Sequence, residues 1–396
     1  MRKIPPLLIM DAFRGFAALW VVMCHASMQF IDGGHLEYFK NPLYAFSCYG
    51  ALGVPIFFVI SGYCITGAAY ESIRTSGGVT RFVSARIRRI YPPYLVVFAL
   101  TVLIGVVSVT ANKHILRLSH DMRLSSLNFW LTNLTLTHHA FKEPVCVMVS
   151  WSLCYELTFY AIVGVFISFA NYLHRGYRNK KIRTLSLLTF FLTLLSLTWL
   201  ILSPKTCPYP LDYWYQFGIG GMLFFCLSSH DKPHVKCRGA LFFQFILIEI
   251  LTLAFGLMYR FSHVKRELQE GFVLAHPNPT TREEALVCVT TAMLLWFLWQ
   301  KEHSLVNSRL IQMLMWLGTI SYSLYLTHML VLPFLIARMS LIGLDGHYYW
   351  ITFLCVLTAS VIGGWIFNRF VESPFISFMN RQRVDEERKL IKNALL

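Results

Sequence analysis

Long apolar stretches alternate with short polar ones along the whole chain, and this alternation predicts a bundle of membrane-spanning helices. Crossing about 30 Å of hydrocarbon takes roughly 20 apolar residues in a helix, and the sequence offers such windows repeatedly. About ten windows predict spans, at approximate limits 7–30, 47–70, 91–111, 148–170, 184–203, 211–229, 240–260, 285–300, 311–337 and 349–371. The expected fold class is therefore all-α, a polytopic transmembrane helix bundle.

The pattern predicts one transmembrane domain, residues 1–375, followed by a short charged tail, residues 376–396. Neither an internal repeat nor a linker divides the chain. Only Arg2 and Lys3 precede the first apolar run, and no small-residue cleavage pattern follows, so we expect an uncleaved first span. The longest polar connection, about 111–147, could fold as a lid or a substrate-contacting loop.

Composition agrees with a membrane protein and excludes an ordinary soluble domain. Of the 396 residues, 56% are hydrophobic and only 14% are charged, and the mean hydropathy is +0.54. The formal charge of +15 could suggest a nucleic-acid partner, but the basic residues lie in short loops between spans. With the N-terminus inside, the inner segments hold about 22 of them and the outer ones about 11, which predicts that both termini are cytoplasmic and that no nucleic acid is bound.

Ten cysteines are scattered mainly through the predicted spans, without a CxxC pair or a His-Cys cluster at metal-ligand spacing. We therefore expect free thiols that pack in the interior, and no metal site. The sequon at Asn133 lies in a predicted outer loop and is weak support for glycosylation.

The first span carries three residues that a lipid-facing helix would not need: Asp11, Arg14 and His25. Asp11 and Arg14 are three residues apart and can pair on one helix face. From Arg14 to His25, eleven residues return to within about 20° of the same azimuth and rise roughly 16 Å. The three side chains could form a functional stripe at two depths. Alternatively, the charged pair only anchors the helix end and the histidine is a buried, hydrogen-bonded core residue.

Two further clusters are expected on the cytoplasmic side and in the second span. The arginines of "RFVSARIRRIYPPYL", which include Arg86 and Arg89, are read as a loop. They either orient the protein or grip phosphates by forked hydrogen bonds. In "VPIFFVISGYCI", Gly53, Ser61 and Gly62 allow close approach of a neighbouring helix.

The fourth and ninth spans add polar residues in the outer half of the membrane. "VSWSLCYELTFY" supplies Trp151, Ser152 and Glu156, and "LGTISYSLYLTHML" supplies Tyr325 and His328. A carboxylate beside an imidazole raises its basicity and fixes its tautomer, so Glu156 is a candidate partner of His25. The alternatives are a carboxylate that lines a hydrated cavity and, for His328, a purely structural histidine.

The expected polar residues fall into two layers. The inner layer holds Asp11, Arg14, Arg86, Arg89 and Glu372, and the outer layer holds His25, Trp151, Glu156 and His328. Periodicity alone does not show that these helices are neighbours. Glu249, in the seventh predicted span, fits neither layer.

Five stretches together resemble the acyltransferase-3 family of integral-membrane acyltransferases. The family's Arg-x10-His pattern matches Arg14 and His25, FFxxSG matches Phe57 to Gly62, and Arg-x-x-Arg matches Arg86 and Arg89. Its Trp-Ser-Leu-x-x-Glu stretch resembles Trp151 to Glu156, and its late Ser-Tyr-x-x-Tyr-x-x-His segment resembles "ISYSLYLTH". The resemblance covers about residues 7–375, and Thr327 stands where Trp is common.

The resemblance implies an integral protein of the bacterial inner membrane that moves an acyl group, commonly acetyl, from acyl-CoA to a hydroxyl of a carbohydrate or glycolipid. It implies no tightly bound cofactor; acetyl-CoA is the donor substrate. Asp11, Arg14, Arg86 and Arg89 would bind the donor. Catalysis would involve His25, Glu156 and His328, with His25 as general base or transient acyl carrier. The substrate would be bound by Trp151, Ser152, Ser61 and Tyr325. The rival interpretation is a transporter or flippase of a saccharide or lipid-linked substrate, because intramembrane charges also mark substrate pathways. The oligomeric state is open.

Overall fold

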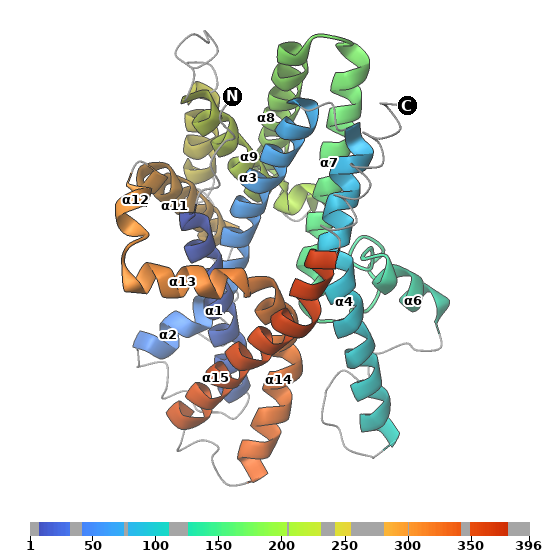
Figure 1. Ribbon diagram of the computed structural model, residues 1–396, viewed down its shortest axis with the longest axis vertical. Coiled ribbons are helices and arrows are strands. Elements are labelled where there is room, and N and C mark those ends of the chain that lie inside the picture. The colour runs from blue at the N-terminus through green and yellow to red at the C-terminus, as the bar shows by residue number, and fades with distance from the viewer. Residues whose placement is uncertain are drawn as a thin grey trace, which may run out of the picture. The chain divides into compact units, whose positions relative to one another are not determined.

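The computed structural model describes residues 8–31, 42–74, 78–110, 126–203, 206–230, 242–254, 281–299, 301–341 and 349–378, and every regular element in these ranges is a helix (Figure 1). The all-α prediction is therefore confirmed. The helices are α1 (Ile9–Ile31), α2 (Pro42–Cys48), η2 (Tyr49–Leu52), α3 (Gly53–Arg74), α4 (Gly78–Thr110), α6 (Leu127–Leu134), α7 (Ser150–Leu173), α8 (Arg178–Leu202), α9 (Leu211–His230), α11 (Thr281–Trp299), α12 (Glu302–Leu305), α13 (Arg309–Thr319), α14 (Ser321–Leu341), α15 (Tyr349–Phe367) and the π-helical η5 (Asn368–Glu372).

Each predicted window overlaps at least one helix. The window 240–260 overlaps a further short helix, Phe242–Ala254. Within the described ranges six helices are long and apolar enough to cross a membrane, or seven if a bent pair counts as one span. The chain is thus a multi-pass integral membrane protein. The count of ten spans and the cytoplasmic position of both termini stay predictions, and most of the predicted tail lies outside the described residues.

The start of α4 corrects the sequence interpretation. The arginine-rich stretch was expected to be a loop before a span at residue 91, but α4 is helical from Gly78 and continues through Pro92 and Pro93. Proline usually marks a helix start in water, because its missing N–H is then one of the unpaired groups. Within a membrane helix, neighbouring helices and local adjustments can satisfy the freed carbonyls. Arg86 and Arg89 consequently lie on a helix, three residues apart.

The predicted span 311–337 is also interrupted. It consists of α13 and α14, which meet at Ile320 with a bend of 71°. Gly318 lies directly against the backbone of α1, and the Thr319 hydroxyl donates to the Trp316 carbonyl oxygen at 2.7 Å. The close packing of Gly318 on α1 and the Thr319 hydrogen bond at the end of α13 accompany this bend. The sequence gives no sign of it, because residues 311–337 form an uninterrupted apolar run.

The chain divides into two compact units whose segments alternate along the sequence. The first unit comprises Met1–Val83 and Ser152–Thr319, and the second comprises Ser84–Trp151 and Ile320–Leu396. The boundaries fall within α4, at the start of α7 and between α13 and α14. The candidate residues are therefore distributed over two packing units.

In the first unit, α1 packs against α13 at backbone distance. A Cβ atom on Gly15 would lie 2.0 Å from the Leu314 carbonyl oxygen, and one on Gly318 would lie 2.0 Å from the Asp11 carbonyl oxygen. Any larger side chain would push the helices apart. Because lipid removes most of the hydrophobic drive between helices, such van der Waals contact is what holds them together.

Helix α3 uses the same device on two sides, as Gly53 and Gly62 predicted. A Cβ on Gly53 would lie 2.6 Å from the Ala17 carbonyl oxygen of α1, and one on Gly62 would lie 2.0 Å from the Phe217 carbonyl oxygen of α9. In return, Gly220 of α9 abuts the Val59 carbonyl oxygen. Helices α3 and α9 run side by side in Figure 1. The interior thiols agree with this packing, since Cys24 is fully buried and donates from Sγ to the Cys48 carbonyl oxygen at 3.2 Å.

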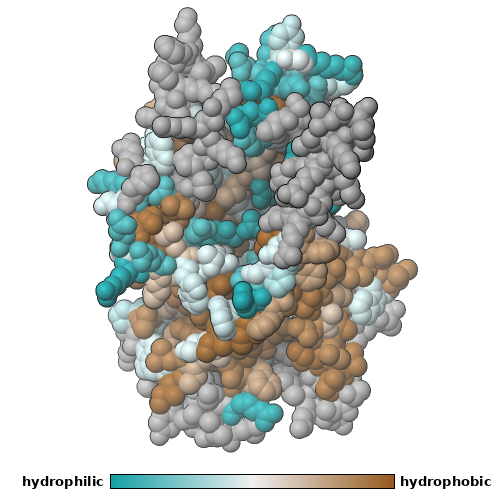
Figure 2. Space-filling view, in the orientation of Figure 1, coloured by the Kyte–Doolittle hydropathy of each residue, from teal (hydrophilic) through white to brown (hydrophobic). Residues whose placement is uncertain are grey.

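In the second unit, α14 and α15 pack side by side (Figure 1). A Cβ on Gly364 would lie 2.8 Å from Cα of Leu324. The outward faces of α4 and α15 carry exposed large apolar side chains, among them Leu103, Val107 and Leu354. Brown apolar surface extends over this part of the molecule in Figure 2, as lipid contact requires.

The described end of the long polar connection, residues 126–149, is packed and not extended. Tyr94 of α4 donates from its hydroxyl to the Asn133 carbonyl oxygen at 2.8 Å. The Asn133 amide donates to the carbonyl oxygens of Phe129 and Pro144 and accepts from the Cys146 N–H. Asn133 is fully buried, so its side chain organises this segment and is not presented as a glycan acceptor.

His138 belongs to the same segment and is also fully buried. Its Nε2 atom lies 3.3 Å from Ser150 Oγ. Burial, with a smaller electrostatic contribution from the neighbouring His139, lowers the pKa of His138 to about 4. The folded protein therefore holds this ring neutral.

Gly318→Ala should weaken the α1–α13 contact, because the added methyl would meet the Asp11 backbone. Overpacking of this kind costs roughly 1–3 kcal/mol. Thermal unfolding of the purified protein in detergent should show a lower midpoint for Gly318→Ala. The control is Gly164→Ala, whose Cβ would meet its nearest neighbour at an ordinary 3.4 Å. Equal midpoints for the two variants would contradict the packing argument.

Acidification should destabilise the segment through His138. A histidine whose folded pKa is depressed contributes full stability above its unfolded value of about 6.5, and this stability is lost as the pH falls toward 4. The unfolding midpoint should fall more steeply between pH 7 and 5 in the wild type than in His138→Gln. A slope unchanged in His138→Gln would refute this assignment.

Candidate functional site

The predicted stripe on α1 begins with an ion pair. Arg14 Nη1 lies 3.7 Å from Asp11 Oδ1, and both side chains are half-buried. One turn earlier, the Ile9 N–H donates to a buried Glu302 carboxylate at 2.9 Å, which satisfies part of the exposed helix start. The charged end of α1 is therefore held by α12 and α13, within the first unit.

At the other end of α1, the helix itself orients His25. Its Nδ1 lies 3.1 Å from the Val21 carbonyl oxygen, one turn back. A carbonyl oxygen only accepts, so Nδ1 carries the proton and Nε2 of the neutral ring keeps its lone pair. His25 is thus oriented as a base, which is the state that proton abstraction from a hydroxyl requires.

Glu156 lies in a different hydrogen-bonded cluster. Ser61 of α3 donates to its carboxylate at 3.3 Å, and Tyr160, one turn along α7, donates to the same oxygen. Ser61 and Glu156 are half-buried and Tyr160 is buried. The side chains of the FFxxSG and Trp-Ser-Leu-x-x-Glu stretches therefore meet directly, in a contact that the sequence could not show.

The register between α1 and α3 separates this cluster from His25. Gly50 abuts Trp20, while Gly53 abuts Ala17 and Val21, so the helices run antiparallel. Ser61 lies eight residues beyond Gly53, about 12 Å toward the Arg14 end.

His25 lies one turn beyond Val21 in the opposite direction. The packing therefore favours Glu156 as a neighbour of the donor half of the stripe. Its role as the partner of His25 stays a prediction, and the Val21 carbonyl oxygen of α1 is one source of the tautomer of His25.

The first unit contains further polar contacts between residues that the sequence motifs did not single out. The Tyr155 hydroxyl donates to Asp212 at 2.6 Å, and the Gln216 amide donates to Glu284 at 3.2 Å. Hydrogen-bonded polar pairs between membrane helices stabilise their packing. Asp212 and Glu284 begin α9 and α11, where negative charge favours a helix N-terminus, and this was the one signal available in the sequence.

In the second unit, the Arg86 and Arg89 end of α4 adjoins the start of α14. The Tyr322 hydroxyl donates to the Ile90 carbonyl oxygen at 2.8 Å. The next residue, Ser323, donates to the buried Glu372 carboxylate at 2.6 Å. One turn of α14 thus connects the arginine-bearing segment of α4 with η5. The inner layer was expected to bring Arg86, Arg89 and Glu372 to the same level, and this connection agrees with that expectation.

His328 repeats the local arrangement of His25. Its Nδ1 lies 3.2 Å from the Leu324 carbonyl oxygen, so Nε2 keeps the lone pair. The ring is fully buried beside Tyr325, with 6.0 Å between ring centroids. The Tyr325 hydroxyl donates to the Val149 carbonyl oxygen at 3.3 Å, two residues before the half-buried Trp151. The second unit therefore joins the expected residues Tyr325 and His328 to the start of α7.

The two units divide the expected site. Asp11, Arg14, His25, Ser61, Glu156 and the buried Ser152 belong to the first unit, and Arg86, Arg89, Trp151, Tyr325 and His328 belong to the second. Glu249 has an unexpected environment: it is buried in the first unit, and neither carboxylate oxygen has a hydrogen-bond partner among the described residues. Across all the residues that the structure describes, no group of three or more His, Cys, Asp or Glu side chains could hold a metal ion.

Comparison with known proteins gives the family. The model of the family described as an acyltransferase domain matches residues 7–369. A Bacillus subtilis (strain 168) protein provisionally named peptidoglycan O-acetyltransferase YrhL is 25% identical over 404 residues, which cover 96% of this chain and 57% of the relative. O-acetyltransferase OatA of Staphylococcus aureus (strain NCTC 8325 / PS 47) is 28% identical over 195 residues, 48% of this chain and 28% of the relative.

No solved structure matches the chain. The chain spans little more than half of YrhL and a smaller part of OatA. The family match, however, extends from the first helix to η5 and includes the Arg14–His25 stripe, the arginines of α4 and the start of α14. The chain belongs to the acyltransferase-3 family.

Proposed function

We propose that this protein is an O-acyltransferase of the bacterial plasma membrane that moves an acetyl group from cytoplasmic acetyl-CoA to a hydroxyl of a cell-envelope carbohydrate. The observation that carries the proposal is the α1 stripe of a family member, with an arginine near one end and a histidine about 16 Å further along the same face. A phosphopantetheine arm is about as long as that rise. One helix face can therefore serve both ends of the donor.

The donor end is assigned to Arg14, with Asp11 orienting its guanidinium. Arginine binds phosphate oxygens by forked, charge-assisted hydrogen bonds. We assign Arg86 and Arg89 to the same anionic donor because they match the family's Arg-x-x-Arg pattern. The half-buried Ser61 and Glu156 would offer hydrogen bonds to the amides of the arm, because their cluster lies toward the Arg14 end of α1.

The reacting end is assigned to His25. Its Nε2 atom would take the proton of the acceptor hydroxyl while the hydroxyl oxygen attacks the thioester carbonyl. The carbon–sulfur bond then breaks, and the CoA thiolate leaves and takes up a proton. A transient acyl group on Nε2 would use the same lone pair. In both routes the Val21 carbonyl keeps the proton on Nδ1.

The acceptor is proposed by class. One relative carries peptidoglycan in its name and both are named O-acetyltransferases, which supports a carbohydrate hydroxyl such as that of a peptidoglycan sugar. Trp151, Ser152 and Tyr325 are proposed for acceptor binding and His328 for catalysis, because their positions match the family's motifs.

Replacing His25 by Ala should reduce acetyl transfer by roughly 10²–10⁴-fold, the usual contribution of a general base. Transfer is measured as radiolabel moved from acetyl-CoA into cell-envelope carbohydrate by membranes with matched amounts of each protein. His139→Ala, which changes an exposed histidine, is the control and should transfer normally. Full incorporation by His25→Ala would mean that the histidine is structural.

Replacing Arg14 by Gln should raise the KM for acetyl-CoA about tenfold, since one charge-assisted contact is worth about 1.5–3 kcal/mol, and should change kcat little. The matched control is Arg74→Gln, because Arg74 pairs with Glu71 at the same i, i+3 spacing as Arg14 with Asp11. An equal KM for wild type and Arg14→Gln would remove Arg14 from the donor site.

A further inference from the structure

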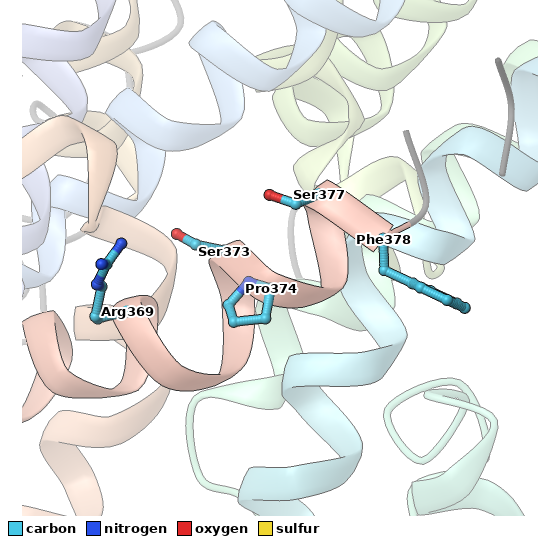
Figure 3. Close-up of a pocket in the computed structure, with 5 residues that line it drawn as sticks. All are labelled: Arg369, Ser373, Pro374, Ser377 and Phe378. Carbon is cyan, nitrogen blue, oxygen red and sulfur yellow. The ribbon is translucent and has the colours of Figure 1, made fainter. Parts of the chain in front are cut away.

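An open pocket of about 320 Å³ lies at the end of the last described helix, and the donor and acceptor assignments make no use of it. Its lining residues are Arg369, Ser373, Pro374, Ser377 and Phe378. Figure 3 shows the two serine hydroxyls on one side of the helix together with the Arg369 side chain, while Phe378 points away. The pocket therefore presents one cation and two hydroxyl groups.

The π turn of η5 helps to align these groups. Arg369, Ser373 and Ser377 are spaced four residues apart, and in a regular α-helix each such step overshoots a full turn by about 40°. A π turn closes with i to i+5 hydrogen bonds and so rotates less per residue. Because Asn368–Glu372 forms such a turn, the drift from Arg369 to Ser377 is offset. Single π turns inside α-helices are frequent at functional sites.

Arg369 keeps its charge uncompensated within the described part of the chain, where no carboxylate lies within ion-pair distance of it. The nearest acid in sequence, Glu372, is buried and turned inward. Its Oε2 accepts from Ser323 at 2.6 Å and from the Asn368 amide at 2.9 Å. The wide turn therefore places the acid in the interior and the guanidinium at the surface.

The length of the helix places the pocket at the membrane surface. Trp350–Phe378 is a candidate span of 29 residues, or about 43 Å, against about 30 Å of hydrocarbon. Because the polar residues Asn368, Arg369 and Glu372 lie toward the C-terminal end of this span, we place its excess length, and the pocket with it, in the headgroup region. Phe370 and Phe378 are exposed on this part of the helix, where apolar side chains can contact lipid.

We infer that the pocket lined by Arg369, Ser373 and Ser377 binds a phosphate group at the membrane–water interface. The guanidinium offers a phosphate two parallel N–H donors, and the Ser377 hydroxyl offers a further O–H donor. The Ser373 hydroxyl donates to the Asn368 side-chain oxygen at 3.1 Å, and it would turn from that oxygen to contact the phosphate. A phosphate can come from two sources here, the headgroup of an anionic phospholipid or a phosphate of CoA.

Both sources fit this position. The exposed phenylalanines fit a lipid. Within the second unit, Ser323 contacts Glu372 while Tyr322 contacts Ile90, next to Arg89. The pocket thus lies on the segment that adjoins the α4 arginines, and the CoA source rests on the proposed function.

The test measures binding of two probes to the purified full chain. One arm titrates CoA by calorimetry. The other compares retention of phosphatidylglycerol with that of phosphatidylcholine of the same acyl chains by native mass spectrometry. Arg369→Gln should weaken binding at least tenfold in one arm, and Ser373→Ala with Ser377→Ala should weaken it about threefold in the same arm. Arg309→Gln, which removes an exposed arginine outside the pocket, should bind both probes as the wild type does.

A loss confined to CoA assigns the pocket to the donor, and a loss confined to phosphatidylglycerol assigns it to a lipid. If both pocket variants match Arg309→Gln in both arms, or if the wild type binds neither probe, the inference is overturned. Equal thermal unfolding midpoints exclude misfolding of the variants. Because both arms measure binding alone, the result does not depend on whether acetyl is transferred.

Discussion

Backbone contact through glycine holds α1 along most of its length, and the polar chemistry of the first unit depends on that contact. Gly15 and Gly318 bring α13 against the Asp11–Arg14 turn, while Gly50 of η2 and Gly53 at the start of α3 lie against residues 17–24. Charged side chains in a membrane are costly unless they are paired or hydrated. A helix fixed on both sides can keep its arginine and its histidine on one face at a constant separation, which a donor of fixed length requires.

Helix geometry contributes directly to the orientation of both histidines. His25 and His328 both donate from Nδ1 to the carbonyl oxygen one turn back, so each helix sets the tautomer of its own histidine. Glu156 is itself part of a hydrogen-bonded cluster. Its contacts with Ser61 and Tyr160 connect α3 and α7 in the first unit, and the register of α1 against α3 relates the cluster to the donor half of the stripe.

Hydropathy predicted the helix windows, because crossing hydrocarbon imposes both apolar composition and length. The sequence pattern also predicted the pairing of Asp11 with Arg14, from their spacing on one helix, and the close approach of another helix at Gly62. It failed where tertiary contacts decide. The helical course of α4 through Pro92 and the bend at Ile320 both depend on surrounding helices.

The sequence also did not reveal hydrogen bonds between residues that lie far apart along the chain. The bond between Ser61 and Glu156 joins residues 95 positions apart, and Asn133 is buried by contacts that a sequon does not reveal. The η5 turn has no hydropathy signature at all, although it decides that Glu372 is buried while Arg369 is exposed. The residues of the candidate site could be named from motifs, but their separation into two packing units could not.

The most direct test of the α1 stripe is an experimental structure of the protein with a non-transferable acetyl-CoA analogue. The account predicts that the acetyl-bearing sulfur position lies within hydrogen-bond reach of His25 Nε2, and that a CoA phosphate contacts the Arg14 guanidinium. An analogue whose acetyl group lies away from His25, or whose phosphates lie away from Arg14, would contradict it.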